Sequence, residues 1–180
     1  LGTTIVKDIN SGSNSSNPAE LTLVNNSLYF TAYDSTTSAT ELFQSDGTNM
    51  GTIILSSDIN SPELLTAVGD TLYFSAISSS TNAPAASLGV LWNSDGTNSG
   101  TEIIDNNVIP IQIITSEDLI YVIANKFMME NQLRSYDGTT SIVDSGVGVE
   151  NVAIVGHTLF YTKGNNLHYH ATNHGEFITL

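Results

Sequence analysis

The sequence predicts an all-β protein, a β-propeller or a segment of one, built from about four four-stranded antiparallel blades. Three observations lead to this prediction: short apolar bursts separated by Ser, Thr and Asn, a turn motif that recurs along the chain, and strands with large side chains on both faces. No stretch has the periodicity of a helix. The 180 residues are 40% hydrophobic, which is enough to bury a sizeable core in one domain or one repeat array.

Two sequence markers show internal repetition. Asp-Gly-Thr occurs three times, within residues 45–48, 94–97 and 136–139. An apolar and aromatic run occurs four times, at residues 28–30, 72–74, 120–122 and 159–161. A proline stands ten residues before the first three of these runs, at Pro18, Pro62 and Pro110. Because three equal spacings are hard to obtain by chance, the chain is best read as a repeat array.

Each repeat is predicted to contain four strands. The first ends in a short polar turn that closes a tight hairpin, and it covers residues 21–24, 64–68, 111–115 and 152–155. The second strand is the apolar and aromatic run. The third covers residues 41–45, 90–94, 132–136 and 166–170. The fourth follows the Asp-Gly turn, whose glycine supplies the left-handed conformation of the hairpin, and it lies within residues 2–6, 51–54, 100–104, 141–143 and 176–178.

The second strands carry large side chains on both faces. In the first repeat Leu28 and Phe30 point one way and Tyr29 points the other. A sheet with two covered faces lies between neighbours, as the radial blades of a propeller do. A two-sheet sandwich would leave a clean polar face on most strands, and a β-solenoid usually has shorter and more uniform coils.

The fourth strand has five copies, whereas each of the other strands has four. Either the last copy, at residues 176–178, is misassigned, or the chain comes from a longer array. We favour the second interpretation, in which residues 1–9 are the last strand of a preceding blade. The fourth repeat is divergent and can serve as a cap. The predicted blades cover residues 10–59, 60–108, 109–148 and 149–180.

The turn region resembles a known repeat family. Glu41-Leu42-Phe43-Gln44-Ser45-Asp46-Gly47-Thr48, followed by Gly51-Thr52, resembles the ELWxxDGT repeats of bacterial, often surface-exposed proteins. The second repeat keeps the tryptophan of that family, Trp92. The resemblance weakens in the third repeat and nearly vanishes in the fourth. It implies a propeller-like architecture within large extracellular proteins, and it implies no established reaction.

The charge of the chain excludes two classes of partner. Four basic residues stand against eighteen acidic ones, which gives a formal net charge of −14. Phosphate backbones and anionic membranes would be repelled, so no nucleic-acid partner and no membrane insertion are expected. No apolar run is long enough to span a membrane, and there is no cysteine for a disulfide or thiolate site. Cations, neutral sugars and proteins remain as partners.

The Asp-Gly turns are the first candidate site. In the structural interpretation each aspartate caps its own turn through backbone N–H groups. In the alternative the aspartates bind Ca²⁺, although each turn offers only one carboxylate and the ion needs several oxygen ligands. The residues concerned are Asp46, Gly47, Asp95, Gly96, Asp137 and Gly138.

Histidines and aromatic residues form the other candidates. His168 and His170 are two apart on a strand and share a face, so with His157 or a carboxylate nearby they could chelate a transition metal. Otherwise they are polar surface positions. Tyr33 and Trp92 could stack on a sugar, but the position of Trp92 on a third strand also fits packing between blades.

These features predict a non-enzymatic, extracellular module with no cofactor. It would be structural or adhesive, and its partners would be other protein subunits, copies of itself or a surface glycan. The alternative is a Ca²⁺-dependent, lectin-like module. A third hypothesis, an extracellular hydrolase, needs a catalytic pair that no motif in the sequence nominates.

Overall fold

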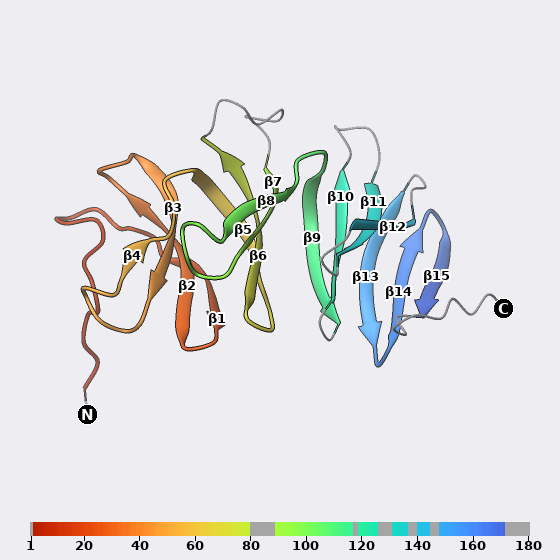
Figure 1. The fold of residues 1–180 in the computed structure, drawn as a ribbon, viewed down its shortest axis with the longest axis horizontal. Helices are drawn as coiled ribbons and strands as arrows, with labels where there is room; N and C mark the ends of the chain where they lie inside the picture. The colour runs from red at the N-terminus through yellow and green to blue at the C-terminus, as the bar shows by residue number, and fades with distance from the viewer. Residues whose placement is uncertain are drawn as a thin grey trace. The chain divides into compact units, whose positions relative to one another are not determined.

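The computed structural model describes residues 2–79, 89–116, 119–125, 131–136, 140–144 and 148–171. Every regular element among these residues is a β-strand, and the strands form four separate antiparallel sheets of three or four strands (Figure 1). The all-β prediction is therefore confirmed. None of the four sheets closes on itself.

Within each sheet the strands follow one another in chain order, because each is joined to the next by a hairpin connection. The first sheet contains β1 (Ala19–Val24), β2 (Ser27–Asp34), β3 (Ala39–Ser45) and β4 (Ile53–Ile54). The second contains β5 (Ile59–Val68), β6 (Thr71–Ser78), β7 (Val90–Ser94) and β8 (Thr101–Asp105). This succession matches the predicted four strands per repeat in the first two repeats.

The third and fourth sheets repeat the same meander. The third contains β9 (Ile109–Ser116), β10 (Leu119–Asn125), β11 (Asn131–Tyr136) and β12 (Thr140–Asp144). The fourth contains β13 (Val149–Val155), β14 (Thr158–Lys163) and β15 (Asn166–Ala171). The strand predicted at residues 176–178 lies outside the described residues. The chain divides into two compact units, Leu1–Asn106 and Asn107–Leu180, so that each unit holds two sheets.

The segment before β1 differs from the sequence prediction. Residues 2–9, expected as a strand, have no strand assignment. Ile9 packs instead against the apolar cluster of Phe30, Ala32 and Phe43 on the first sheet. The Lys7 Nζ donates a hydrogen bond to the Thr52 carbonyl oxygen at 2.6 Å. A strand needs a hydrogen-bonding neighbour along its length, whereas this segment is held by side chains lying on an apolar sheet face.

Each sheet has two faces, which we name by the side chains that the second strand of the sheet places on them. The front face carries the side chain at the position of Phe30, and the back face carries the side chain at the position of Tyr29. The strand registers identify the equivalents in the other sheets, because each second strand pairs with its third strand in the same way. The front positions are Phe74, Val122 and Tyr161, and the back positions are Tyr73, Tyr121 and Phe160.

In the first unit, the back face of the first sheet packs against the front face of the second sheet. Val24, Tyr29 and Leu42 supply the first side of this core. Leu72, Phe74, Ala76 and Trp92 supply the other side. At roughly 25 cal/mol per Å² of buried apolar surface, such a layer of large side chains is the main source of stability for the pair.

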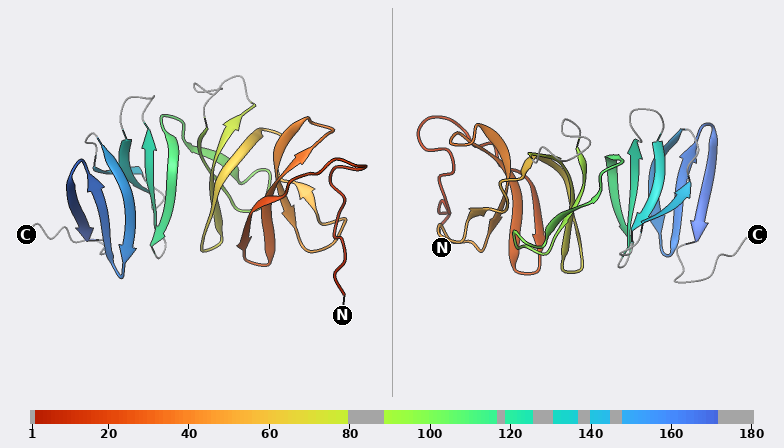
Figure 2. Two further views of the ribbon diagram at one scale, coloured as in Figure 1. Left: turned by 180° about the vertical axis from the view of Figure 1, so that it is seen from behind. Right: turned by 45° about the horizontal axis from the view of Figure 1, so that its top comes forward.

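The second unit is built in the same way. Tyr121, Ile123 and Leu133 of the third sheet form one core with Val152, Leu159 and Tyr161 of the fourth. The back face of one sheet again meets the front face of the next. Figure 2 shows the strands of these sheets from two further directions.

Candidate functional site

The aspartate of each described Asp-Gly-Thr turn binds groups of its own turn. The Asp46 Oδ1 accepts hydrogen bonds from the backbone N–H of Thr48 at 2.8 Å and from its hydroxyl at 2.7 Å. In the second repeat Asp95 accepts the same pair from Thr97, again at 2.8 and 2.7 Å. These bonds favour the ionised carboxylate, and the threonine hydroxyl contributes most to lowering the pKa of Asp46 and of Asp95.

A second set of hydrogen bonds closes the loop between the third and fourth strands. The Ser45 and Thr52 hydroxyl oxygens lie 2.7 Å apart, and the Thr52 hydroxyl lies 2.7 Å from the Thr48 carbonyl oxygen. The Gly47 N–H donates to the Ser45 hydroxyl at 3.1 Å. The second repeat reproduces all three contacts through Ser94, Gly96, Thr97 and Thr101. The described turns are therefore self-contained hydrogen-bonded units.

The second glycine of the motif also has a structural role that the sequence analysis missed. A Cβ atom at Gly51 would overlap the carboxylate of Asp46, and one at Gly100 would overlap that of Asp95. The first glycine is needed for a different reason, because Gly47 and Gly96 have φ angles of +88° and +91°. The signal that could have identified Gly51 and Gly100 is their identical spacing of five residues from the aspartate.

The turn geometry bears directly on the Ca²⁺ hypothesis. Each described turn presents one carboxylate, and one oxygen of it already accepts two hydrogen bonds. No group of three or more His, Asp or Glu side chains gathers anywhere in the described part of the chain. Asp137 and Gly138, the third candidate pair, lie outside the described residues.

We predict that Ca²⁺ leaves the thermal stability of the protein unchanged, because each of the two described turns offers a single carboxylate and uses one of its oxygens within the turn. A folded-state site occupied at 100 times its Kd would add about 2.7 kcal/mol and raise the Tm by several degrees. The measurement is a thermal melt in excess Ca²⁺ and in excess chelator. A rise in Tm that Asp46→Asn and Asp95→Asn abolish would contradict the prediction.

The histidines occupy two separate settings in the fourth sheet. His168 and His170 both lie on the front face of β15, where they pair across the ladder with Tyr161 and Leu159. The His168 ring stacks on Tyr161 with centroids 5.3 Å apart, and burial lowers the pKa of His170. His157 is exposed in the turn between β13 and β14. His168 and His170 lie on the same face of β15, as predicted, and the ring that contacts His168 is that of Tyr161.

The two aromatic candidates lie in different environments. Trp92 is 4% exposed, its Nε1 donates to the Ala76 carbonyl oxygen at 3.1 Å, and its ring stacks on Phe74 with centroids 6.1 Å apart. Its place is in the core between the first two sheets. Tyr33, at the end of β2, is 37% exposed, and its backbone N–H donates to the Ser16 carbonyl oxygen at 2.7 Å. Tyr33 therefore presents an aromatic surface beside the loop of residues 10–17.

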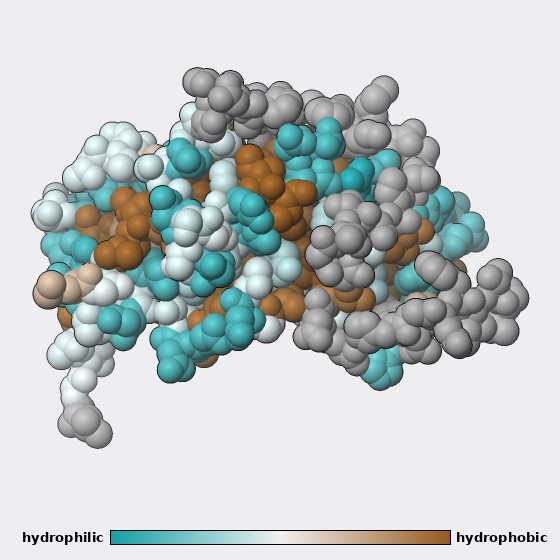
Figure 3. Space-filling model, viewed as in Figure 1, coloured by the Kyte–Doolittle hydropathy of each residue, from teal (hydrophilic) through white to brown (hydrophobic). Residues whose placement is uncertain are grey.

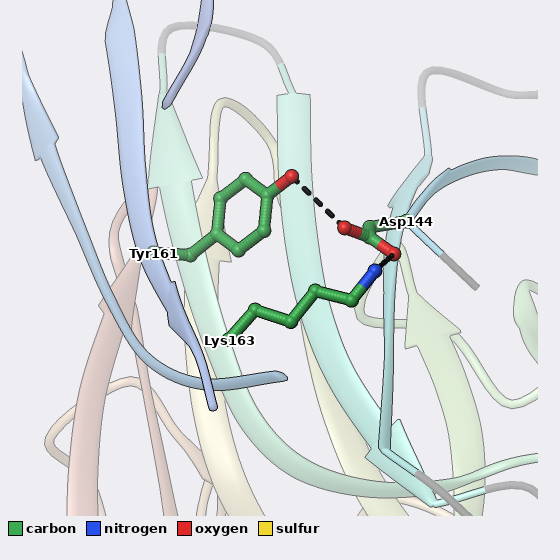
Figure 4. Close-up of polar contacts among 3 residues, drawn as sticks. All are labelled: Asp144, Tyr161 and Lys163. Atoms are coloured by element: carbon green, nitrogen blue, oxygen red, sulfur yellow. Dashed lines mark hydrogen bonds and ion pairs between the residues drawn. The ribbon is translucent and has the colours of Figure 1, made fainter. Parts of the chain in front are cut away.

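A polar cluster joins the third sheet to the fourth (Figure 4). The Lys163 Nζ lies 2.7 Å from the Asp144 Oδ1, and the Tyr161 hydroxyl donates to the Asp144 Oδ2 at 3.0 Å. Burial, followed by the hydrogen bond and charge of Asp144, raises the pKa of Tyr161 to about 12. No sequence motif marks this cluster, because the three residues meet only through the packing of the third sheet against the fourth.

We predict that Tyr161 makes the second unit sensitive to alkaline pH. Its pKa is about 10 in an unfolded chain and about 12 in the folded one, so the folded state binds the proton more tightly. The resulting stability is complete below pH 10 and is lost as the pH rises towards 12. Urea midpoints measured over this range should fall more steeply for the wild type than for Tyr161→Phe. Equal slopes would count against this role, since the other tyrosines are common to both proteins.

Comparison with known proteins leaves the family open. No model of a known protein family and no curated protein matches this chain. The ELWxxDGT resemblance therefore stays a prediction that depends on the two described turns. Among the described residues, no helix is long and apolar enough to cross a membrane.

Proposed function

We propose that this chain is a non-enzymatic module of β-propeller type that contacts proteins or glycans, or assembles with copies of itself, within an extracellular surface protein. The observation that carries the proposal is the repeated back-to-front packing of sheets, which both units share. Each sheet needs neighbours on its two faces, and a module of this kind gains stability by adding equivalent sheets.

The residues that recur with the repeat support a structural role. Asp46 and Asp95 hold their own turns closed, and Trp92 fills the core. Catalytic carboxylates instead aim at a substrate position from a cleft. The residues that resemble the repeat family are thus used to build sheets and hairpins, which favours a scaffold over an enzyme.

The end of β2 supports a binding role. Tyr33 is partly exposed there, and the neighbouring loop is ordered by the bond from Tyr33 to Ser16 and by the Asn10 side-chain amide, which donates to the Ser15 carbonyl oxygen at 3.2 Å. An aromatic ring beside polar loop groups is a suitable platform for the apolar face of a sugar or for a protein side chain. The net charge of −14 favours neutral or cationic partners.

The test combines binding with turnover. The labelled chain is applied to immobilised glycans, to immobilised copies of itself and to extracellular proteins, and in parallel it is incubated with chromogenic glycosides, esters and peptides. We expect saturable binding without product, and we expect Tyr33→Ala to weaken binding to a glycan but leave the fold intact. Turnover of any substrate, or the absence of binding to all three classes of surface, would overturn the proposal.

A further inference from the structure

The front face of the first sheet contains an apolar hollow. Its volume is about 310 Å³, and Val6, Lys7 and Ile9 of the N-terminal segment form one wall. Ser16 and Pro18 of the loop before β1 also line it, and the remaining lining comes from the first sheet and its turn, at Leu21, Leu28, Phe30, Ser45, Gly47 and Thr52. In Figure 3 apolar side chains reach the surface over β3 and β4 of this sheet.

The equivalent position on the second sheet is filled by a tyrosine. The hydroxyl of Tyr29, from the back face of the first sheet, occupies the space in which a Cβ at Gly96 would lie. Gly47 is the matching residue of the first sheet, and a Cβ there would meet nothing within 4 Å. The hollow at Gly47 is thus the same kind of site that receives Tyr29 at Gly96, without the incoming side chain.

The first strands of the two sheets differ in the same way. Leu65 and Ala67 of β5 pack against the core between the first and second sheets. Their equivalents in β1, Leu21 and Leu23, are 67% and 66% exposed. The strand registers establish this equivalence, since Leu23 pairs with Leu28 and Ala67 pairs with Leu72. The front face of the first sheet therefore has the apolar residues of a packed face but lacks a covering sheet.

The complementary surface lies on the back face of the fourth sheet. Val155 and Leu167 are 68% and 72% exposed. Their equivalents in the first sheet, Val24 and Leu42, are 4% and 0% exposed because the second sheet covers them. Phe160 stands at the position of Tyr29, and the ring of Tyr169 lies beside it with centroids 6.4 Å apart.

We propose that the front face of the first sheet in one copy receives the back face of the fourth sheet from a second copy. Phe160 would enter the hollow above Gly47 as Tyr29 enters the site at Gly96, and Leu167 would cover Leu21. The inference rests on the proposed function. It extends to the contact between chains the packing of a back face on a front face that is seen inside both units. Such a contact is heterologous, so repeated addition gives rings or filaments.

The charges of the chain set the conditions for this assembly. Apolar side chains dominate both faces, with Lys7 in the wall of the hollow and Glu41 beside Ala32 as the charged residues of the first face, whereas each copy carries a net charge of −14. Two copies repel one another over the Debye length, which shortens from about 8 Å at 0.15 M salt to about 3 Å at 1 M. We therefore expect self-association to strengthen with salt.

The test uses the full chain and sedimentation velocity over a concentration series at high salt. Leu21→Asp places a charge on the first face and Leu167→Asp places one on the second, both at exposed positions that leave the fold intact. Each variant should associate with itself at least about tenfold more weakly than the wild type, because an unpaired carboxylate would be buried in an apolar contact. Met50→Asp is the control, since Met50 is 91% exposed and is not among the residues that line the hollow.

Mixing the two variants makes the test specific. Leu167→Asp retains an intact first face and Leu21→Asp retains an intact second face, so an equimolar mixture should form one-to-one dimers and no larger species. A monomeric wild type at every concentration, variants that associate like the wild type, or a mixture that stays monomeric would each overturn the inference. A monomer that still binds glycans or other proteins would leave the proposed function standing.

Discussion

Replacing Trp92 by alanine is expected to lower the free energy of unfolding of the first unit by about 3–5 kcal/mol, the range for a large aromatic residue removed from a core. Trp92 packs against Phe74 and lies in the core with Tyr29 and Leu42. Its loss also leaves the Ala76 carbonyl oxygen without the indole N–H. Calorimetry or far-UV circular dichroism in urea would measure the change, since tryptophan fluorescence is lost with the residue.

Tyr33→Ala is the matched control for that experiment. Tyr33 and Trp92 are both aromatic residues on strands of the first unit, but Tyr33 is 37% exposed and Trp92 is 4% exposed. We expect Tyr33→Ala to change stability by less than about 1 kcal/mol, as surface substitutions usually do. A loss for Trp92→Ala as small as that expected for Tyr33→Ala would contradict the role assigned to Trp92 in the stability of the core.

The hairpins were predictable because their signals are local. Gly47 and Gly69 have positive φ angles in their turns, as tight hairpins need. The alternation of Leu28, Tyr29 and Phe30 along one strand assigns their side chains to opposite faces. The behaviour of residues 2–9 was not predictable in this way. Their apolar residues resemble a strand, but strand formation depends on a pairing edge elsewhere in the chain.

The candidate sites show the same division between local and distant causes. The aspartates of the turns could be read from the sequence, because their partners Thr48 and Thr97 lie two residues away. Whether Trp92 is a ligand platform or a core residue depends on which sheet covers β7. The contact of Asp144 with Tyr161 spans 17 residues and two sheets, so it follows from packing and not from any motif.

The contact between Tyr29 and Gly96 gives the second large prediction. Gly47→Ala should lower the free energy of unfolding by about 1–2 kcal/mol, the usual penalty for a left-handed conformation with a Cβ. Gly96→Ala should lower the free energy of unfolding by about 1–3 kcal/mol more than Gly47→Ala does, the range for overpacking. The reason is that Tyr29 occupies the space of a Cβ at Gly96 and not at Gly47. Urea unfolding of the two variants measures both losses of stability. The backbone penalty should be the same for both, since the φ angles of Gly47 and Gly96 are +88° and +91°.

A double-mutant cycle identifies the cause of the difference. Tyr29→Phe removes the hydroxyl that a Cβ at Gly96 would meet, so in that background Gly96→Ala should become about as mild as Gly47→Ala. The coupling should then equal the excess penalty, since residues in contact are non-additive and distant ones are additive. Tyr29→Phe should leave the effect of Gly47→Ala unchanged. If the two alanine variants are equally destabilising with Tyr29 present, Tyr29 does not pack against the turn at Gly96. The packing of the first sheet's back face on the second sheet's front face would then lack its most specific contact.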